Sequence, residues 1–259
     1  MGIAAEISEV AARRELIVAL AMREVRVRYK HTLLGVGWAV ALPLSLMLVF
    51  TYVFSRVAEV QTHGIPYPLF AYIGLLPWQL HANIVTHGAQ SLVSNRALVT
   101  KVYFAREVLP LSAVLSALVD FAVASLVLAG LMAWYGVAPQ VGLALLPVVL
   151  LVQLVFGVGC ALVLSAANLL YRDVQYMLQV GVLLWMFASS VVYPIPRGGG
   201  FDWLVWLNPM TPILDSYRGL IMGRGLAPEF WFAALLSVVF ALLAWRWFRR
   251  VERVFGELA

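Results

Sequence analysis

The sequence contains few charged residues for its length. Asp, Glu, Lys and Arg make up 12% of the 259 residues, whereas a soluble domain of ordinary composition contains about a quarter. Hydrophobic residues make up 63% of the chain, and the mean hydropathy is +0.91. This composition is typical of a membrane protein. The net charge of +5 does not indicate nucleic-acid binding, because the basic residues flank apolar runs rather than forming one polar surface.

Cysteine is nearly absent. Cys160 is the single cysteine and lies inside an apolar run, which excludes an intrachain disulfide and a cysteine-based zinc site. His81 and His87 are six residues apart, which is off the i, i+4 spacing of a helical metal pair. We therefore expect no metal site, and we expect Cys160 to pack in the interior.

The sequence motifs of a nucleotide-hydrolysing enzyme are absent as well. No GxxxxGK[ST] occurs, so the chain cannot hold a nucleotide in a P-loop. The two lysines, Lys30 and Lys101, do not follow glycine-rich turns. No Ser/His/Asp set, and no convergent set of acids or histidines at one membrane face, supports an enzyme acting on a membrane glycolipid. We expect a protein without catalytic activity or a bound cofactor of its own.

Long apolar runs take up most of the chain. A transmembrane helix needs about 20 predominantly apolar residues, and six runs approach or exceed this length. The fold class that we predict is an all-α membrane protein with spans at residues 35–54, 67–92, 108–135, 141–170, 174–193 and 230–248. No cleavable signal peptide is expected, because the N-terminus lacks a basic segment followed by an apolar one.

An N-terminal helix precedes the spans, a short tail follows them, and a long connector separates spans five and six. Residues 1–30 predict an interfacial amphipathic helix, with a stripe formed by Val18, Met22, Val25 and Tyr29. The transmembrane domain covers 31–251 and a cytoplasmic tail covers 252–259. Between spans five and six, the Pro-, Gly- and Trp-rich residues 194–229 predict short helices that re-enter the membrane from one side.

The stretch 91–110 lies between spans two and three and is too charged to lie in hydrocarbon. It predicts a short cytoplasmic helix that turns Leu98, Val102 and Phe104 toward the bundle and could bind a soluble partner. The alternative is an ordinary positive loop that only sets topology. Lys and Arg are concentrated here, before span one and after span six, so both termini are predicted to be cytoplasmic.

Asp120 is the one acidic residue deep inside an apolar run. A charge at the centre of a transmembrane helix costs about 2.5–3.5 kcal/mol on insertion scales. Such residues therefore face the bundle interior or a water-filled path. No basic partner is evident within the spans, although Ser116 and Ser125 could solvate the carboxylate. We expect a structural or pore-adjacent role. The alternative is a proton-coupled secondary transporter that uses Asp120.

Aromatic residues cluster on the outer half of span one and along span two, and include Phe50, Tyr52, Phe54 and Tyr72. Aromatic faces can stack on sugar rings, so a carbohydrate conduit would require such residues. Lipid-facing packing and interfacial belts explain them equally simply. The aromatics alone favour the second interpretation.

Five blocks of sequence resemble the ABC-2 type polysaccharide-export permeases. Together they cover nearly the whole chain in the order found in that family. The blocks are RYKHTLLGVGW at 28–38 with Pro43, 67–70 with 74–78, 91–95 through 101–104 with 109–110, 171–174, and 193–194 with 207–210.

The resemblance implies a homodimer that assembles with two copies of a separate P-loop ATPase, which would bind ATP and Mg. The implied substrate is a lipid-linked polysaccharide of the O-antigen type, moved across the inner membrane. Export of capsular polysaccharide or teichoic acid is the alternative within the family. Residues 194–229 would then form a periplasmic cap.

The resemblance also implies roles for individual residues. It makes 91–110 the coupling helix, with a contact to the ATPase at Asn95, Arg96, Lys101, Arg106 and Glu107. It puts the N-terminal helix at the entrance for the glycolipid, where basic side chains would meet a pyrophosphate. The residues at this entrance are Arg23, Arg26, Arg28 and Lys30. A path lined by Phe50, Tyr52, Phe54 and Tyr72 would carry the glycan.

Overall fold

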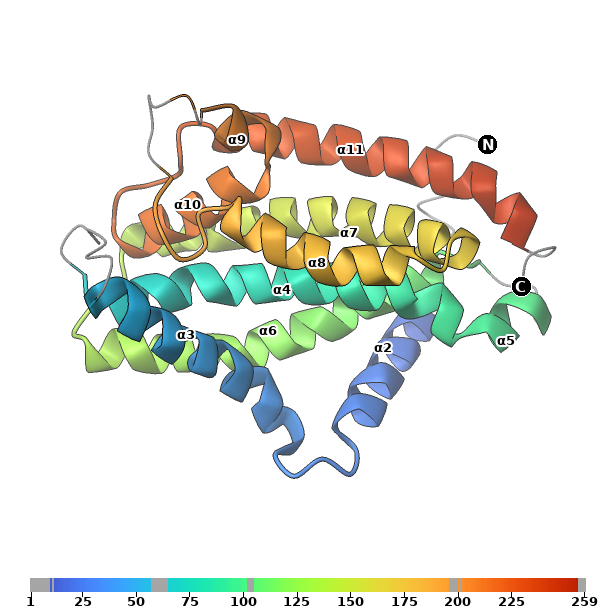
Figure 1. Cartoon of the computed structure of the whole chain (residues 1–259), viewed down its shortest axis with the longest axis horizontal. Helices are drawn as coiled ribbons and strands as arrows, with labels where there is room; N and C mark the ends of the chain where they lie inside the picture. Colours follow the sequence, from blue (N-terminus) through green and yellow to red (C-terminus); the bar gives the residue numbers. More distant parts are fainter. Residues whose placement is uncertain are drawn as a thin grey trace.

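The computed structural model describes residues 10, 12–56, 65–101, 105–195, 200 and 202–255, and all of its regular structure is helical. The prediction of an all-α chain is confirmed for these residues. The long helices lie mostly along one axis (Figure 1). The α-helices of the described residues, long and short, are α2 (Arg14–Tyr29), α3 (Trp38–Arg56), α4 (Tyr67–Ser94), α5 (Arg96–Lys101), α6 (Val108–Trp134), α7 (Leu146–Leu170), α8 (Val174–Phe187), α9 (Asp202–Leu207), α10 (Met210–Ile221) and α11 (Phe230–Val251).

Four of the six predicted spans are long and apolar enough to cross a membrane. They are Gly35–Phe54, Val108–Trp134, Val141–Leu170 and Phe230–Val251. The second predicted span forms the 28-residue helix α4. It is not among these four, because several polar side chains along it lower its mean hydropathy. The fifth forms only the 14-residue helix α8, which ends at Phe187 rather than at residue 193. There the chain turns, and the Ser189 hydroxyl donates to the Trp185 carbonyl at 2.8 Å.

Helix α4 is the centre of the fold, with α6 and α7 packed along it and α3 crossing its first half (Figure 1). Leu69, Tyr72 and Ile84 are completely buried. At Gly88, an added Cβ would lie 2.6 Å from the Cβ of Ala161. The glycine therefore allows the backbones of α4 and α7 to approach each other closely.

The segment between α8 and α11 contains two short helices, α9 and α10, as the sequence predicted. Asn208 precedes α10 and joins it to the turn after α8, because its Nδ2 donates to Ser189 Oγ at 2.8 Å. Trp185 Nε1 donates in return to Asn208 Oδ1 at 2.9 Å. Most of α10 is buried against α4, α7 and α11. Its re-entrant position in a membrane stays a prediction.

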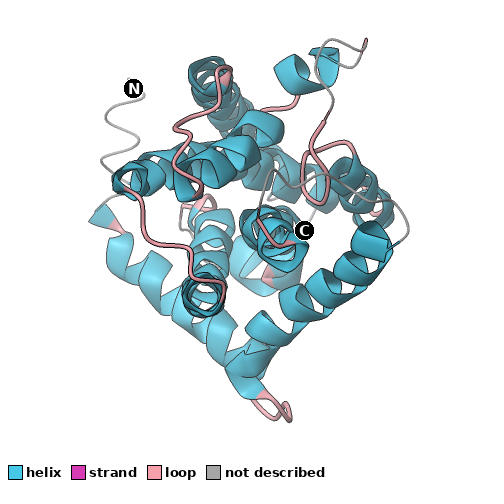
Figure 2. Cartoon of the chain, turned by 90° about the vertical axis from the view of Figure 1, so that its left-hand side faces the viewer, coloured by secondary structure: helices cyan, strands magenta, loops and turns pink. Residues whose placement is uncertain are grey.

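Helices α2 and α3 form a V whose tip projects from the bundle (Figures 1 and 2). The tip, the elbow formed by residues 30–37, turns sharply because His31 and Gly35 have left-handed backbones with φ of +62° and +54°. Helix α2 packs on α6, and its Ala21 is 1% exposed. Only part of the predicted apolar stripe contacts the bundle, since Val18 and Met22 are exposed.

Candidate functional site

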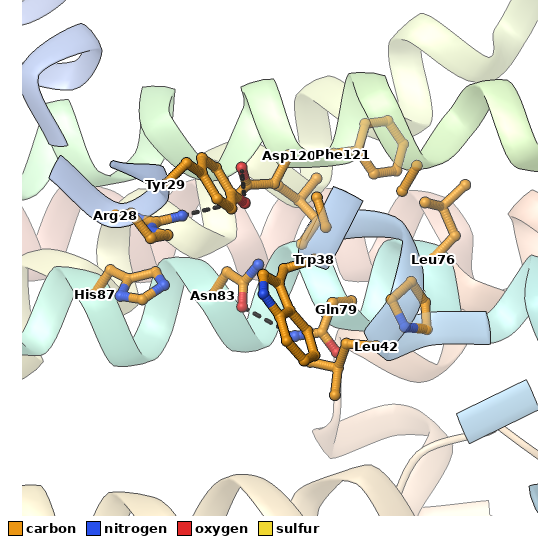
Figure 3. A pocket seen from close by; sticks show the side chains of 14 residues that line it. Arg28, Tyr29, Trp38, Leu42, Leu76, Gln79, Asn83, His87, Asp120 and Phe121 are labelled. Carbon is orange, nitrogen blue, oxygen red and sulfur yellow. Dashed lines mark hydrogen bonds and ion pairs between the residues drawn. The ribbon is translucent and has the colours of Figure 1, made fainter. Parts of the chain in front are cut away.

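The end of α2 is held to the middle of α6 by a cluster of charged and polar side chains (Figure 3). Arg28 forms an ion pair with Asp120, and its Nη2 donates to Ser116 Oγ at 2.9 Å. The Tyr29 hydroxyl donates to the other oxygen of Asp120 at 2.8 Å. The side chain of Asp120 is only 7% exposed. Both oxygens of this buried carboxylate are therefore bound by groups from the N-terminal helix.

The sequence analysis found no basic partner for Asp120 within the predicted spans. The partner is Arg28, which lies 92 residues away in the sequence and outside the predicted spans. Ser116 contributes through Arg28, whereas Ser125 donates to the backbone carbonyl of Phe121 and does not contact the carboxylate. The sequence did not reveal this partner outside the spans, because the pairing depends on how α2 packs against α6, which local sequence does not specify.

A cavity of about 230 Å³ lies at the elbow, between α2, α3, α4 and α6. Trp38 is 51% exposed and lies at the elbow (Figure 3). On α4, Gln79 Nε2 donates to Asn83 Oδ1 at 2.9 Å. We call this space the elbow cavity. Its lining residues are Arg28, Tyr29, Trp38, Ala39, Leu42, Pro43, Leu76, Gln79, Leu80, Asn83, His87, Asp120, Phe121 and Ala124.

A second cavity of about 320 Å³ continues along α4 toward its C-terminal end. It shares Arg28 and His87 with the elbow cavity, so the two spaces adjoin. We call this second space the adjacent cavity. Its lining residues are Leu20, Arg23, Glu24, Val27, Arg28, His87, Gln90, Ser91, Ser94, Asn95 and Leu109.

Besides Leu76 and Leu80, the α4 side of the two cavities carries a polar stripe that the sequence analysis missed. It consists of Gln79, Asn83, His87, Gln90 and Ser94, each three or four residues after the last. This spacing puts them on one face of the helix. The signal was present as a helical period of polar residues inside an otherwise apolar run. It was overlooked because the run was judged by its average apolarity.

The four basic residues predicted to meet a pyrophosphate do not form one cluster. Arg23 and Arg28 line the adjacent cavity, and Arg28 is already paired with Asp120. Arg26 and Lys30 are exposed and line neither of the two cavities. The structure therefore provides at most two of these cations to a ligand in this region.

The residues predicted to contact an ATPase divide into two groups. Arg96 is exposed at the start of α5, and Asn95 Nδ2 donates to the Ser91 carbonyl at 2.9 Å. Among the α5 side chains that the structure describes, Val99 is buried and Leu98 is partly buried. The side chain of Lys101 lies outside the described part of the structure, as do Val102 and Phe104.

Arg106 and Glu107 face inward instead. Glu107 is 1% exposed and pairs with Arg249 of α11 at 3.2 Å. Arg106 Nη1 donates to the Glu252 carbonyl at 2.5 Å. Burial raises the pKa of Glu107 above its usual range, which Arg249 only partly offsets. A buried carboxylate cannot contact a partner in this conformation, so these two residues join α11 to the loop before α6.

The four aromatic residues predicted to line a glycan path also differ in exposure. Tyr72 is completely buried, and its hydroxyl donates to the Ala124 carbonyl at 3.0 Å. Its side chain is therefore not on any channel surface in this structure. Phe54 packs against Phe50 and stacks on Tyr67, with ring centroids 6.0 and 6.1 Å apart. Tyr52 is 72% exposed.

Comparison with known proteins identifies relatives over most of the chain. The family model for ABC-2 type transporters matches residues 15–222. An O-antigen export system permease protein from Myxococcus xanthus is 34% identical over 89% of both chains. A protein of the same description from Klebsiella pneumoniae is 29% identical over 94% of this chain and 95% of its own. A polysialic acid transport protein from Escherichia coli is 24% identical over 80% and 81%.

Proposed function

Because this chain belongs to the ABC-2 type transporter family, we propose that it is the permease subunit of an ATP-driven exporter of a lipid-linked polysaccharide of the O-antigen type. The observation that carries this proposal is the match to two O-antigen export permeases at 34% and 29% identity over nearly the full length of each. The four apolar helices of the structure are consistent with a membrane-embedded subunit.

The energy source must be a partner protein, because the chain contains no P-loop. The proposed assembly is a homodimer of this chain with two copies of a P-loop ATPase, which binds ATP and Mg. The contact on this chain is α5 and the residue before it, through Asn95, Arg96 and Lys101. Arg106 and Glu107 are not part of this contact. They join the loop that follows α5 to the C-terminal end of α11.

The proposed location is the inner membrane, with both termini in the cytoplasm. The distribution of Lys and Arg along the sequence supports this orientation. Helix α5 and the C-terminal end of α11 lie at one end of the bundle, and α9 and α10 lie at the other (Figure 1). If the bundle axis runs perpendicular to the plane of the membrane, this orientation puts α5 on the cytoplasmic side and the α9–α10 segment on the periplasmic side.

Export of a capsular polysaccharide is the second candidate, supported by the 24% identical polysialic acid transport protein. A proton-coupled transporter that uses Asp120 is less well supported than it was from sequence alone. The carboxylate binds Arg28 and Tyr29 and thereby holds α2 to α6. Such an ion pair at a bundle interior satisfies a buried charge without any transported proton.

The test is co-purification of the tagged chain from its native membranes, followed by an ATPase assay. A P-loop ATPase should co-purify, and Arg96→Glu should reduce the amount by about tenfold, because reversal of an interfacial charge creates repulsion. Arg224→Glu, an exposed change three residues after the end of α10, should leave the amount of co-purified ATPase unchanged. Deletion of the chain should also abolish the surface polysaccharide. An unchanged cell surface after deletion would refute the proposal.

A further inference from the structure

The two cavities lie next to each other along one helix. The elbow cavity and the adjacent cavity share Arg28 and His87, and α4 contributes Gln79 and Asn83 to one and Gln90 and Ser94 to the other. From Gln79 to Ser94 the helix rises roughly 22 Å, at about 1.5 Å per residue. We call these two adjoining cavities together the α4 groove. Their lining follows enough of the helix for an extended ligand to contact both.

The charges in the α4 groove largely compensate one another. Arg28 is paired with Asp120. Glu24 lines the same space as Arg23 and accepts a hydrogen bond from Ser112 at 3.4 Å. A phosphate or pyrophosphate is bound best by cations that are not already neutralised. The groove therefore does not have the charge of a phosphate site.

The remaining polar lining consists of neutral groups that both donate and accept hydrogen bonds. The amides of Gln79, Asn83 and Gln90 each provide donors and an acceptor, and the Ser94 hydroxyl provides both. At the elbow, Trp38 has half of its surface free, beside Leu42 and Pro43. Neutral amides with one aromatic face match the hydroxyls and the C–H surfaces of sugar rings.

We propose that the α4 groove binds a neutral stretch of the glycan chain within one protomer. The amides of Asn83 and Gln90 bind sugar hydroxyls, and Trp38 stacks on a ring at the elbow. The Arg28–Asp120 pair builds the wall of the groove by fixing α2 to α6. This inference rests on the proposed function, since it takes the exported polysaccharide as the ligand.

The experiment is photo-crosslinking in cells that carry the whole exporter. The photoreactive p-benzoylphenylalanine replaces Asn83 or Gln90 in the groove, and in a control it replaces Leu126, which is 73% exposed on α6 and lines neither cavity. Adducts are purified through a tag on this chain and probed for sugar by periodate oxidation. Sugar-bearing adducts at the two groove positions and none at Leu126 are expected.

A substitution series provides a second readout in case the bulky probe disturbs folding. Asn83→Leu and Gln90→Leu should each lower the rate of polysaccharide export by about fivefold, which is the loss expected for one or two hydrogen bonds. Thr86→Val is the matched control on the same helix. The Thr86 hydroxyl donates to the Ala82 carbonyl at 2.7 Å and lines neither cavity, so this variant should export normally.

Two outcomes would overturn the inference while leaving the proposed function intact. One is normal export in the Asn83→Leu and Gln90→Leu variants, without sugar adducts at either position. The other is adducts that contain lipid phosphate but no sugar, which would make the groove a headgroup site. If deletion of the chain leaves the surface polysaccharide unchanged, the proposed function itself fails.

Discussion

At the scale of single residues, the ion pair between Arg28 and Asp120 determines where the N-terminal helix lies. Removal of one partner from a buried pair costs about 3–5 kcal/mol, because the other charge is left uncompensated. We therefore predict that Asp120→Asn lowers the thermal stability of the detergent-purified protein markedly. Tyr29→Phe, which removes one hydrogen bond to the same carboxylate, should lower stability by only about 1 kcal/mol.

The double variant Arg28→Met with Asp120→Asn is the control for this prediction. It removes both charges and should recover much of the stability, since neither charge is then buried alone. If Asp120→Asn instead keeps full stability and assembly but abolishes export, the carboxylate has a transport role of its own, and proton coupling through Asp120 would have to be considered again.

His81 has an unusual environment for a histidine. It is completely buried, and neither ring nitrogen has a hydrogen-bond partner. The ring stacks on Phe156 at 5.3 Å and meets Trp185 edge-on at 4.8 Å. Here the imidazole acts as an aromatic ring whose polar atoms are unsatisfied.

We predict that His81→Phe leaves thermal stability unchanged or raises it by about 1 kcal/mol, because unsatisfied buried polar atoms are removed and the ring stacking is retained. His81→Ala should lower stability by several kcal/mol, because it leaves a cavity. Melting curves of both variants test this. A large loss of stability or of export for His81→Phe would mean that the imidazole nitrogens have a function.

Gly74 makes room for a buried arginine. Arg218 of α10 donates to the carbonyls of Ser190 and Val191, and its guanidinium lies 4.2 Å from the ring centroid of Phe70. A Cβ at Gly74 would lie 2.1 Å from the Val191 carbonyl oxygen and 2.3 Å from Arg218 Nη2. Neither the carbonyl nor the buried guanidinium can move away without losing these hydrogen bonds.

We predict that Gly74→Ala destabilises the protein by several kcal/mol through displacement of Arg218. Gly130→Ala in α6 is the matched control, since a Cβ there has nothing within 4 Å. It should be neutral or stabilise the helix by up to about 1 kcal/mol. Equal melting temperatures for the two variants would contradict the role assigned to Gly74.

At the scale of elements, α11 is fastened to the loop that precedes α6. Arg249 pairs with Glu107 at 3.2 Å and with Glu252 at 3.4 Å. Arg106, from the same loop, binds the Glu252 carbonyl. Since this loop follows α5, a movement of the proposed coupling helix would be transmitted to α11 through these contacts.

A pH dependence follows from the burial of Glu107. Its pKa in the folded protein is raised above the ordinary 4.5, mainly by desolvation. The folded state therefore holds this proton more tightly than the unfolded chain does. Stability is expected to fall as the pH rises from about 4.5 through the raised pKa. Glu107→Gln removes this titrating group, so the stability of the variant should change less with pH. Melting temperatures across this pH range test it, and identical slopes for both proteins would contradict it.

Helix α4 has to satisfy two requirements at once. Most of its surface packs in the core, as Leu69, Ile73 and Ile84 do. One face carries the polar stripe that lines the α4 groove. Polar side chains in a membrane-embedded helix face the bundle interior or a wet cavity. The same side chains explain why α4 is not among the helices that qualify as spans by composition.

At the scale of the whole molecule, the proposed orientation can be tested with single cysteines. Cys160 is buried, so the native background of labelling should be low. In intact cells or spheroplasts, Ala138→Cys, in the exposed loop after α6, should react with a membrane-impermeant maleimide. Arg96→Cys should react only after permeabilisation. The reverse pattern would invert the topology and move the proposed ATPase contact to the wrong side.

Much of the fold could be predicted from the sequence by itself. Apolar runs determine the helices, and their lengths identified four spans within a few residues. The composition of residues 194–229 indicated short helices, and α9 and α10 are found there. These features are local, because they depend on residues a few positions apart. The resemblance to ABC-2 permeases is also a property of the sequence, and the family match agrees with it.

Only the tertiary structure decided which side chains meet. Arg28 and Asp120 are 92 residues apart, and Arg106 and Glu252 are 146 apart. Such pairs depend on the packing of helices against each other, which no local pattern encodes. For the same reason, Tyr72 and Glu107 were assigned to surfaces in the sequence analysis and are buried in the structure. The elbow cavity exists only because α2 folds back over α4 and α6, which brings residues from four helices around one space.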